Sequence, residues 1–539
     1  MRNLIKIFIV AAFLMLIIIS LGAQNYDTIS VKEDFDAYND YLVQKHKICT
    51  ISPNGDAFVF GDGMSKVLEG YLDIYDATGD KAYLYKFVMQ SLCIVENRND
   101  INPESLVSTP KWTESTTSTY ADGYIIASLS RFVFFIEILY PELALDSLYQ
   151  FTEIQQVNYS SGTCNCNFSG RDFYTFGEYA KWLSSRVDET FDYFFTNNLW
   201  SESEGMMQPS GGLVVNMQVG FARALLFMGL ATGNVDYQEK AKTIAKLHKT
   251  TVSFDDKCLR EEYEAPVFML DEEKNSYWWY HMGWHVTYRN CKRRRKLMPN
   301  YGYFVAYIED LNHGAIVSLF PYDYYKFAGD TVFTETDMIR FRNTFTKNIF
   351  DGEKYNMGVD GSNGTTYNDK VYDSVTIANT LKYSSLVYSR WSEFDDRDST
   401  SGAPFVYDLT MNDYIKYFNN LKTLPSWYSG QKSLGHAMLI KEQWLRNDVD
   451  LKLANRDVVY DQDFYVSGNL IVEPQNVNLI NKGLPYAEPH SFLDGGKTNR
   501  FVIESGVSVK ISAGKSVHLK QGFYLKDGAS LKIAIREQN

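Results

Sequence analysis

The stretch that decides the fold is Val67-Leu68-Glu69-Gly70-Tyr71-Leu72-Asp73-Ile74-Tyr75, followed by Ala77-Thr78-Gly79-Asp80 and a second apolar run from Ala82. Apolar residues recur at the spacing of a helix face on both sides of the turn. Gly79 suits the left-handed conformation that ends a helix, and Asp80 suits the N-cap of the next helix. The stretch therefore predicts two antiparallel helices joined by a tight turn.

The same unit recurs twice further along the chain. It returns at Phe221 to Leu230, Ala231-Thr232-Gly233-Asn234 and Tyr237 to Leu247, and again at Ala315 to Phe327, Ala328-Gly329-Asp330 and Thr336 to Phe350. Further helices are expected within residues 124–139, 176–197, 374–392 and 434–445. Repeated hairpins over such a length predict a ring of paired helices, closed or incomplete, rather than an open array.

A resemblance follows from the turn itself, Leu72-x-x-Tyr75-x-Ala77-Thr78-Gly79-Asp80-x-x-Tyr83. This type of hairpin resembles those of the (α/α) toroids of glycoside hydrolases and polysaccharide lyases, and the resemblance covers roughly residues 30–445. It implies a mainly α fold, with an (α/α) toroid catalytic domain at 24–450. It implies a carbohydrate-active enzyme without fixing the reaction, because one scaffold supports many chemistries.

The composition changes after about residue 455. Gly506, Gly514, Gly522 and Gly528 recur at spacings of 8, 8 and 6, and each precedes alternating apolar and polar residues. This pattern predicts a small all-β repeat domain at 456–539. It resembles the C-terminal β-stack segments of secreted bacterial enzymes that use the gliding-type export route, which implies an accessory role.

The N-terminus and the charge indicate where the protein works. Arg2 and Lys6 precede an apolar run and a small-residue cleavage site at Leu21-Gly22-Ala23, so residues 1–23 read as a signal peptide. We expect a secreted, periplasmic or cell-surface bacterial protein with no membrane span after signal cleavage. The net charge of −13 argues against nucleic acid as a partner. The six cysteines permit disulfides after export, but neither their pairing nor the oligomeric state can be deduced.

The candidate catalytic residues surround Glu309-Asp310-Leu311-Asn312-His313-Gly314, just before the third hairpin. The resemblance to toroid lyases implies that an amide or acid offsets the charge of a uronate carboxylate, while His and Tyr side chains transfer protons. The residues that match these roles in type are His313, Asn312, Tyr301, Tyr303, Glu309 and Asp310. The alternative is structural, with Asp310 capping the helix and His313 satisfied in the interior.

The candidate substrate-binding residues lie mostly just upstream. Aromatic faces can stack on sugar rings, and the positive run Lys292 to Lys296 can attract acidic groups. The set comprises Trp278, Trp279, His281, His285, Tyr288, Arg289, Arg293 and Asp122. Asp122 also reads as a helix cap, and tryptophans at this spacing are more often part of a core.

No metal or other cofactor is expected. His281 and His285 stand four residues apart, but position 282 is Met instead of the Glu of a zinc-protease helix. The loop from Gly358 to Asp373 could hold calcium, although it misses the EF-hand spacing and reads as a rim loop.

Three functions stay open. The leading one is β-elimination on an acidic, uronate-containing polysaccharide. The second is inverting hydrolysis, which needs two carboxyl groups about 6.5–9.5 Å apart, with Asp62, Asp122, Glu309 and Asp310 as candidates. The third is a polysaccharide-binding protein without catalysis.

Overall fold

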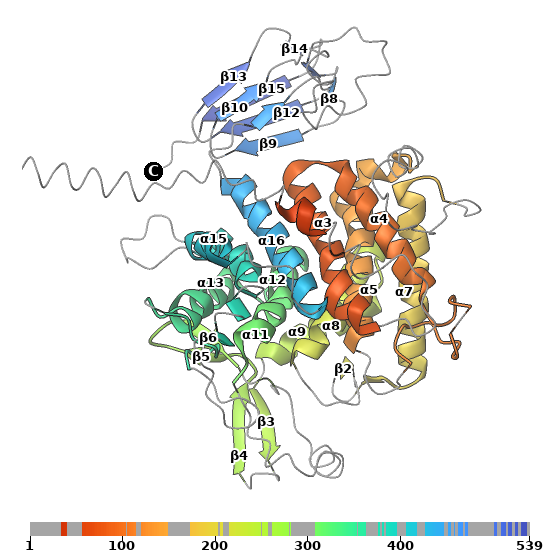
Figure 1. The fold of residues 1–539 in the computed structure, drawn as a ribbon, viewed down its shortest axis with the longest axis vertical. Coiled ribbons are helices and arrows are strands. Elements are labelled where there is room, and N and C mark those ends of the chain that lie inside the picture. The colour runs from red at the N-terminus through yellow and green to blue at the C-terminus, as the bar shows by residue number, and fades with distance from the viewer. Residues whose placement is uncertain are drawn as a thin grey trace, which may run out of the picture.

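The fold is described from a computed structural model of the chain. The structure describes residues 34–39, 42, 57–103, 105–114, 120–148, 173–202, 205–207, 215–249, 251–256, 261–279, 281, 308–352, 354–362, 376–377, 380–381, 384–395, 406–417, 426–446 and nine strands between 451 and 535. These residues are mainly helical, as the sequence predicts, with β structure concentrated at the C-terminal end (Figure 1). The signal-peptide prediction for 1–23 lies outside the described residues.

The first two predicted hairpins are confirmed. Helix α3 (Ser65–Thr78) ends at Gly79, whose φ of 69° is left-handed, and Asp80 caps α4 (Lys81–Glu96) by accepting from the amide of Ala82 at 3.0 Å. Helix α8 (Val215–Thr232) ends at Gly233 with a φ of 71°, and α9 (Val235–Lys249) follows. The residue after each of these glycines, Asp or Asn, accepts from the amides of the new helix, which is why the turns are so short.

The third hairpin differs in detail from its prediction. Its first arm is split into α11 (Leu311–Val317) and α12 (Leu319–Phe327), and Gly329 again has a left-handed φ of 70°. Asp330 does not cap the next helix, because it accepts from the amide of Val332 within the turn. Thr334 caps that helix, α13 (Glu335–Asn343), in a reciprocal arrangement with Asp337, and η5 (Thr344–Ile349) continues it.

The remaining helical elements complete the described set. They are η2 (Val59–Met64), α5 (Tyr120–Phe134), η3 (Phe135–Leu139), η4 (Pro141–Leu145), α7 (Phe176–Thr196), η6 (Ser385–Phe394), α15 (Val406–Tyr417) and α16 (Ser426–Arg446). The predicted helices at 124–139, 176–197 and 434–445 are present with shifted ends. Within the predicted 374–392 segment, the structure gives a 3-10 helix from Ser385, and the residues described before it, Thr376, Ile377, Thr380, Leu381 and Ser384, are helical.

The helices form an inner circuit with a second layer outside it. Helix α3 packs on α5, α5 on α8, α8 on α11 and α12, α11 on η6, η6 on α16, and α16 returns to α3. Outside this circuit α4 packs on α3, α7 on α5, α9 on α8, and α13 and α15 on η6. This closed arrangement of inner and outer helices is the predicted toroid-like ring (Figure 1).

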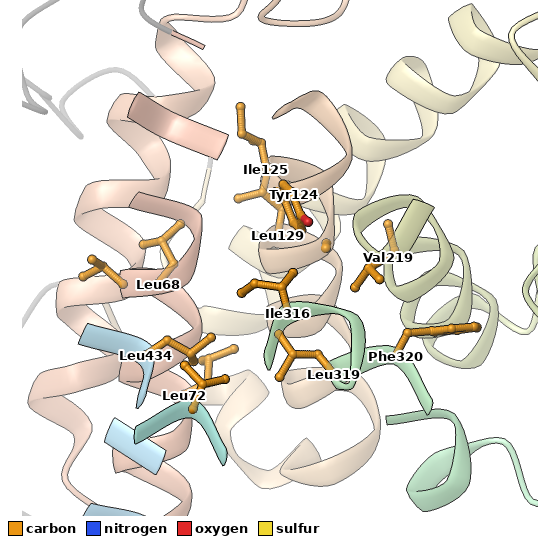
Figure 2. Close-up of a cluster of buried hydrophobic side chains, with 14 of the residues drawn as sticks. Leu68, Leu72, Tyr124, Ile125, Leu129, Val219, Ile316, Leu319, Phe320 and Leu434 are labelled. Atoms are coloured by element: carbon orange, nitrogen blue, oxygen red, sulfur yellow. The ribbon is translucent and has the colours of Figure 1, made fainter. Parts of the chain in front are cut away.

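Apolar side chains from the inner helices meet inside the ring. Figure 2 shows Leu68 and Leu72 of α3, Ile125 and Leu129 of α5, Val219 of α8, Ile316 of α11 and Leu434 of α16 directed toward one interior, and each is at most 4% exposed. Burial of this kind stabilises a fold by about 25 cal/mol per Å² of apolar surface. The core therefore ties together segments more than 350 residues apart in sequence.

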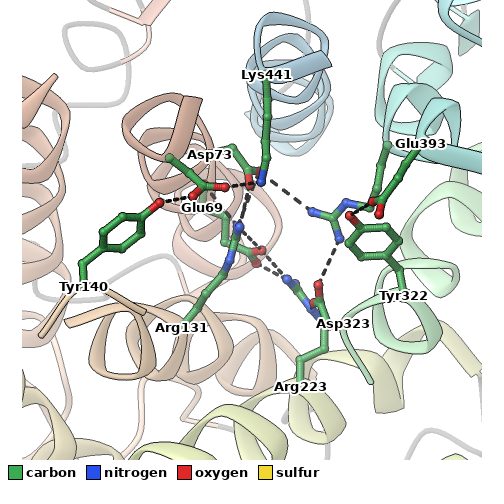
Figure 3. Close-up of polar contacts among 11 residues, drawn as sticks. Glu69, Asp73, Arg131, Tyr140, Arg223, Tyr322, Asp323, Glu393 and Lys441 are labelled. Carbon is green, nitrogen blue, oxygen red and sulfur yellow. Dashed lines mark hydrogen bonds and ion pairs between the residues drawn. The ribbon is translucent and has the colours of Figure 1, made fainter. Parts of the chain in front are cut away.

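Charged side chains fill another part of the interior. Arg223 of α8 pairs with Glu69 of α3 and, at 2.6 Å from Nε to Oδ2, with Asp323 of α12. Asp323 also accepts from Arg390 of η6 at 3.2 Å, and Arg131 of α5 pairs with Asp73 of α3. Burial opposes ionisation of Asp73, but Arg131, Lys441 and Arg390 hold its pKa at about 2. These buried pairs, drawn in Figure 3, connect six inner elements of the ring.

The closest approach between inner helices α5 and α8 depends on two glycines, Gly123 and Gly220. A Cβ at Gly220 would lie 2.5 Å from the carbonyl carbon of Gly123 and 2.6 Å from the amide nitrogen of Tyr124. Both contacts are with backbone atoms, which cannot rotate away. Helix α5 would have to move if position 220 carried any side chain.

We therefore expect Gly220→Ala to lower the free energy of unfolding by about 1–3 kcal/mol, despite the higher helix propensity of alanine. Gly70→Ala is the matched control, since its Cβ would lie 3.2 Å from the Cβ of Ala437, a contact that small shifts can relieve. Urea denaturation followed by circular dichroism measures both variants. Equal stability of the two variants would contradict the proposed packing.

The β structure falls into two groups. The short antiparallel pairs are β1 (Trp200–Ser201) with β2 (Met206–Met207), β3 (Thr251–Asp256) with β4 (Glu261–Pro266), and β5 (Met269–Asp271) with β6 (Ser276–Trp278). The nine later strands are β7 (Leu451–Leu453), β8 (Asp457–Val458), β9 (Gln462–Val466), β10 (Asn469–Val472), β11 (Phe501–Ile503), β12 (Ser508–Ala513), β13 (Ser516–Leu519), β14 (Phe523–Leu525) and β15 (Ser530–Ile535).

These nine strands pair in parallel as three sheets, β7-β10-β13, β8-β11-β14 and β9-β12-β15. Each sheet takes every third strand, so the chain visits the three sheets in turn and repeats the circuit three times. This is the topology of a three-sided parallel β-solenoid. The strands β12 to β15 coincide with the predicted glycine-led runs.

Among the described residues, one helix is long and apolar enough to cross a membrane by length and composition, namely α8. Of its residues, 72% are buried inside the protein. The core helix of a globular fold can have the same length and apolar composition.

Candidate active site

The N-terminal ends of the inner helices gather at one end of the ring. Tyr120 at the start of α5 donates its hydroxyl to Asp62 of η2 at 3.1 Å, and Tyr124 donates to the carbonyl of Asn216 at the start of α8 at 2.6 Å. The amide of Val215 donates to the carbonyl of His281 at 3.2 Å. We call the polar residues at this end the mouth cluster: Asp62, Lys66, Tyr120, Tyr124, His281, Glu309, Asp310, Asn312, His313, Ser384 and Gln431.

Asp310 and His313 form a hydrogen-bonded pair at the start of α11. One carboxylate oxygen of Asp310 caps α11 by accepting from the amides of Asn312 and His313 at 2.8 and 3.0 Å. The other oxygen lies 2.6 Å from Nδ1 of His313. The His313 side chain is 38% exposed, so its second ring nitrogen can meet a ligand while Nδ1 is held in place.

The charges of this pair reinforce one another. Burial would raise the pKa of Asp310, but His313 lowers it to about 2. Burial would likewise lower the pKa of His313, yet the charge and hydrogen bond of Asp310, helped by Glu309, raise it to about 9. The pair therefore consists of a carboxylate and an imidazolium at neutral pH.

Glu309 and His281 lie beneath that pair. Glu309 is fully buried, and its Oε1 lies 2.7 Å from Nδ1 of His281 and 3.9 Å from Nδ1 of His313. Backbone hydrogen bonds fix its segment, because the amide of Glu309 donates to Trp279 and its carbonyl accepts from Val359. The rings of His281 and His313 are 5.0 Å apart between centroids. Ligand atoms of His281, Glu309 and His313 all lie within 4.8 Å of one another, so these three residues could hold a metal ion.

A second wall of the mouth cluster consists of Asp62, Lys66 and Tyr124. The side chain of Asp62 is 21% exposed, and Lys66 lies 3.9 Å from it. Burial lowers the pKa of Lys66, against the opposing effects of Asp62 and Glu69. Burial raises the pKa of Tyr124 well above its ordinary value, and the negative charges of Asp62 and Glu309 add to that rise. Carboxylates on two walls of the mouth cluster, Asp62 and Glu309, therefore both raise the pKa of Tyr124.

Amide and hydroxyl groups of Asn312, Ser384 and Gln431 form a third part of the mouth cluster. Asn312 accepts from the hydroxyl of Ser384 through Oδ1 at 3.0 Å, and its backbone carbonyl accepts from Gln431 at 3.1 Å. Because Oδ1 is used as the acceptor, the amide nitrogen of Asn312 is the donor that remains for a ligand. These contacts bring η6 and α16 to the mouth cluster.

The structure brings together five of the predicted site residues: His281, Glu309, Asp310, Asn312 and His313. The structural alternative for Asp310 is also correct, since it is the N-cap of α11 as well as the partner of His313. Trp278 is half-buried at the end of β6 and packs against the core.

Two substrate-binding predictions are wrong. Trp279 is 1% exposed and packs edge-on against Phe268 and Phe341, so it offers no face to a sugar ring. Asp122 is fully buried and accepts from the backbone amides of Trp112 and Thr113 at 2.8 and 3.0 Å. Asp122 fixes the segment before α5, and its pKa is raised by burial despite Lys111 nearby.

The remaining predicted site residues, Tyr301, Tyr303, His285, Tyr288, Arg289 and Arg293, lie outside the described residues. The same holds for most of the predicted calcium loop, although its described start forms a tight turn in which Asp360 accepts from Ser362 at 2.8 Å.

Sequence reasoning missed Lys66, Tyr120, Tyr124, Ser384 and Gln431. Each lies in an inner element at the ring's mouth, and each comes from a segment remote from residues 278–313. A signal existed for Lys66 in its spacing of four residues from Asp62 on one helical face. The other residues come into the site only through ring closure.

Comparison with known proteins gives a distant structural match. No protein-family model matches the chain, and no curated protein matches it. Solved structures that match include two inactive variants of the α-1,6-mannanase GH76A of Salegentibacter sp. HEL1_6, one in complex with α-1,6-mannotriose and one with α-1,6-mannotetrose. Each is 13% identical and covers 76% of this chain and 99% of that chain, with TM-scores of 0.35 and 0.34. Values this low assign neither a reaction nor a substrate to this chain.

Proposed function

We propose that the mouth cluster hydrolyses glycosidic bonds in a polysaccharide. The observation that supports this most is the presence of carboxylates on two walls of the mouth cluster, Asp62 on one and Glu309 with Asp310 on the other, with the charges of Asp62 and Glu309 both acting on Tyr124. Glycoside hydrolysis needs one group that donates a proton and a second that activates water. A site with these groups on separate walls suits a sugar bound between them.

The roles follow from exposure and hydrogen bonding. Asp62 is accessible and receives a hydrogen bond from Tyr120, which suits a base that removes a proton from the attacking water. His313 is accessible and held through Nδ1 by Asp310, which suits a donor that delivers a proton from Nε2 to the leaving glycosidic oxygen. Water adds to the anomeric carbon as the glycosidic bond breaks. Asp310 acts as a positioning residue.

The charge of the described site bears on the substrate. The described acidic side chains are Asp62, Glu309 and Asp310, and the described basic ones are Lys66, His281 and His313. The two kinds are equal in number, so the described residues favour neither a neutral nor an anionic polymer. The acidic polysaccharide expected from the sequence stays a prediction.

A second candidate is β-elimination on a uronate-containing polysaccharide, favoured by Asn312 and His313. Their remaining donors come from consecutive residues in the first turn of α11, and such donors could offset the charge of a uronate carboxylate. The proton-transferring tyrosines expected in that mechanism, Tyr301 and Tyr303, lie outside the described residues.

Product analysis tests the two reactions against each other. We expect incubation with a panel of neutral and acidic polysaccharides to give saturated products with new reducing ends. We also expect Asp62→Asn to reduce turnover by about 10²–10⁴-fold, with Asp360→Asn, in the turn after Met357, as the matched control. Products lighter by one water, with the absorbance of an unsaturated uronate, would show that the reaction is elimination and not hydrolysis. Binding without turnover on every substrate would indicate the non-catalytic alternative.

A further inference from the structure

We propose that His281, Glu309 and His313 form a binding site for a divalent transition-metal ion of the zinc class. One ligand atom from each residue lies within 4.8 Å of the other two, which brings together a set of nitrogen and oxygen ligands that zinc accepts. Two imidazoles and one carboxylate favour zinc over magnesium or calcium, which prefer oxygen ligands alone. This proposal does not depend on the proposed reaction.

The state of Glu309 supports the site independently. Its side chain is fully buried, and within the described part of the chain its Oε2 has no hydrogen-bond partner. A buried carboxylate oxygen without a partner is costly, because it has lost water without gaining a replacement. A cation bound between Glu309 and the two histidines would supply that partner.

Asp310 provides His313 with the hydrogen-bonding carboxylate that commonly accompanies a metal-binding histidine. Its Oδ2 lies 2.6 Å from Nδ1 of His313, and its Oδ1 is fixed by two backbone amides. A carboxylate hydrogen-bonded to one ring nitrogen fixes the imidazole's orientation. The other nitrogen can then bind the metal after releasing the proton that the imidazolium carries at neutral pH. His313 is also 38% exposed, which gives an ion a path into an otherwise buried cluster.

Three protein ligands would leave the fourth zinc position to water or a ligand. An ion held through His313 also occupies the nitrogen that the proposed hydrolysis uses for proton donation. Added zinc is therefore expected to inhibit hydrolysis, and a chelator to restore it.

Direct binding measurements test the site without any substrate. The full chain, stripped with a chelator, is titrated with Zn²⁺ in competition with a chromogenic chelator, and with Co²⁺ while its visible spectrum is recorded. We expect one equivalent to bind and the cobalt bands to be those of a four-coordinate ion. Affinity should fall at least about tenfold in His281→Ala and in Glu309→Gln, and by about 10–100-fold in Asp310→Asn.

Glu202→Gln is the matched control for Glu309→Gln, since the Glu202 side chain is 80% exposed and remote from the histidines. Circular dichroism and thermal melting establish that each variant is folded. Asp310 is partly exposed and not itself a ligand, so Asp310→Asn keeps the test valid if a ligand variant fails to fold. Absence of stoichiometric binding, or unchanged affinity in folded His281→Ala or Asp310→Asn, overturns the proposal.

Discussion

Replacing His313 by alanine is expected to lower kcat by about 10²–10⁴-fold on the polysaccharide identified by product analysis, while the protein stays folded. The physical reason is that His313 is the proposed proton donor of the mouth cluster, and its Nδ1 lies 2.6 Å from Asp310. Its side chain is 38% exposed, so its removal leaves no large cavity in the core. Steady-state kinetics on the metal-free protein measures the effect.

The variant Asp310→Asn tests whether Asp310 only orients His313 or also stabilises its protonated form. An amide can still accept hydrogen bonds from the backbone at the start of α11, but it cannot stabilise an imidazolium as a carboxylate does. We expect an intermediate loss of kcat, little change in KM, and a pH profile displaced toward lower pH. A His313→Ala variant that retains most of its turnover would exclude His313 as the proton donor.

Replacing Arg223 by alanine is expected to lower the free energy of unfolding by about 3–5 kcal/mol, enough to unfold a marginally stable domain. Arg223 is 1% exposed and neutralises Glu69 and Asp323 on two other inner helices. Its loss leaves both acids buried without their main cation, although Asp323 keeps Arg390 and Glu69 keeps Arg131 at 3.4 Å. Chemical denaturation monitored by tryptophan fluorescence measures the change.

Arg186→Ala is the comparison, because Arg186 pairs with Glu189 one turn away at 2.6 Å and both side chains remain more than a quarter exposed. Pairs of that kind contribute about 0–1 kcal/mol. A double variant that adds Glu69→Gln to Arg223→Ala should recover part of the lost stability, because it removes a buried charge whose remaining partner, Arg131, lies 3.4 Å away. Similar losses in Arg223→Ala and Arg186→Ala would show that the buried network contributes no more than a surface pair.

The hairpins could be predicted from sequence because their signals are local. A left-handed glycine and a capping Asp or Asn act within a few residues, so Gly79 and Gly233 mark their turns whatever surrounds them. The third turn was predicted less well because two capping residues compete there. Asp330 is used inside the turn, and the reciprocal cap of Thr334 with Asp337 begins the helix.

The part of the candidate site that lies within one helical turn could be predicted from the sequence. Asp310, Asn312 and His313 meet because they open α11 together. The wall formed by Asp62, Lys66 and Tyr124 comes from elements almost 200 residues or more away, and proximity there results from ring closure. Trp279 was misassigned for a related reason: nothing local tells which face of a tryptophan the core will cover.

The ion pairs around Arg223 have a consequence for how a polymer can be handled. These side chains meet between the inner helices, so within the described residues they fill interior space that a polymer passing through the ring would need (Figure 3). If the proposed hydrolysis takes place at the mouth cluster, we therefore expect substrate to bind and products to leave at that end of the ring.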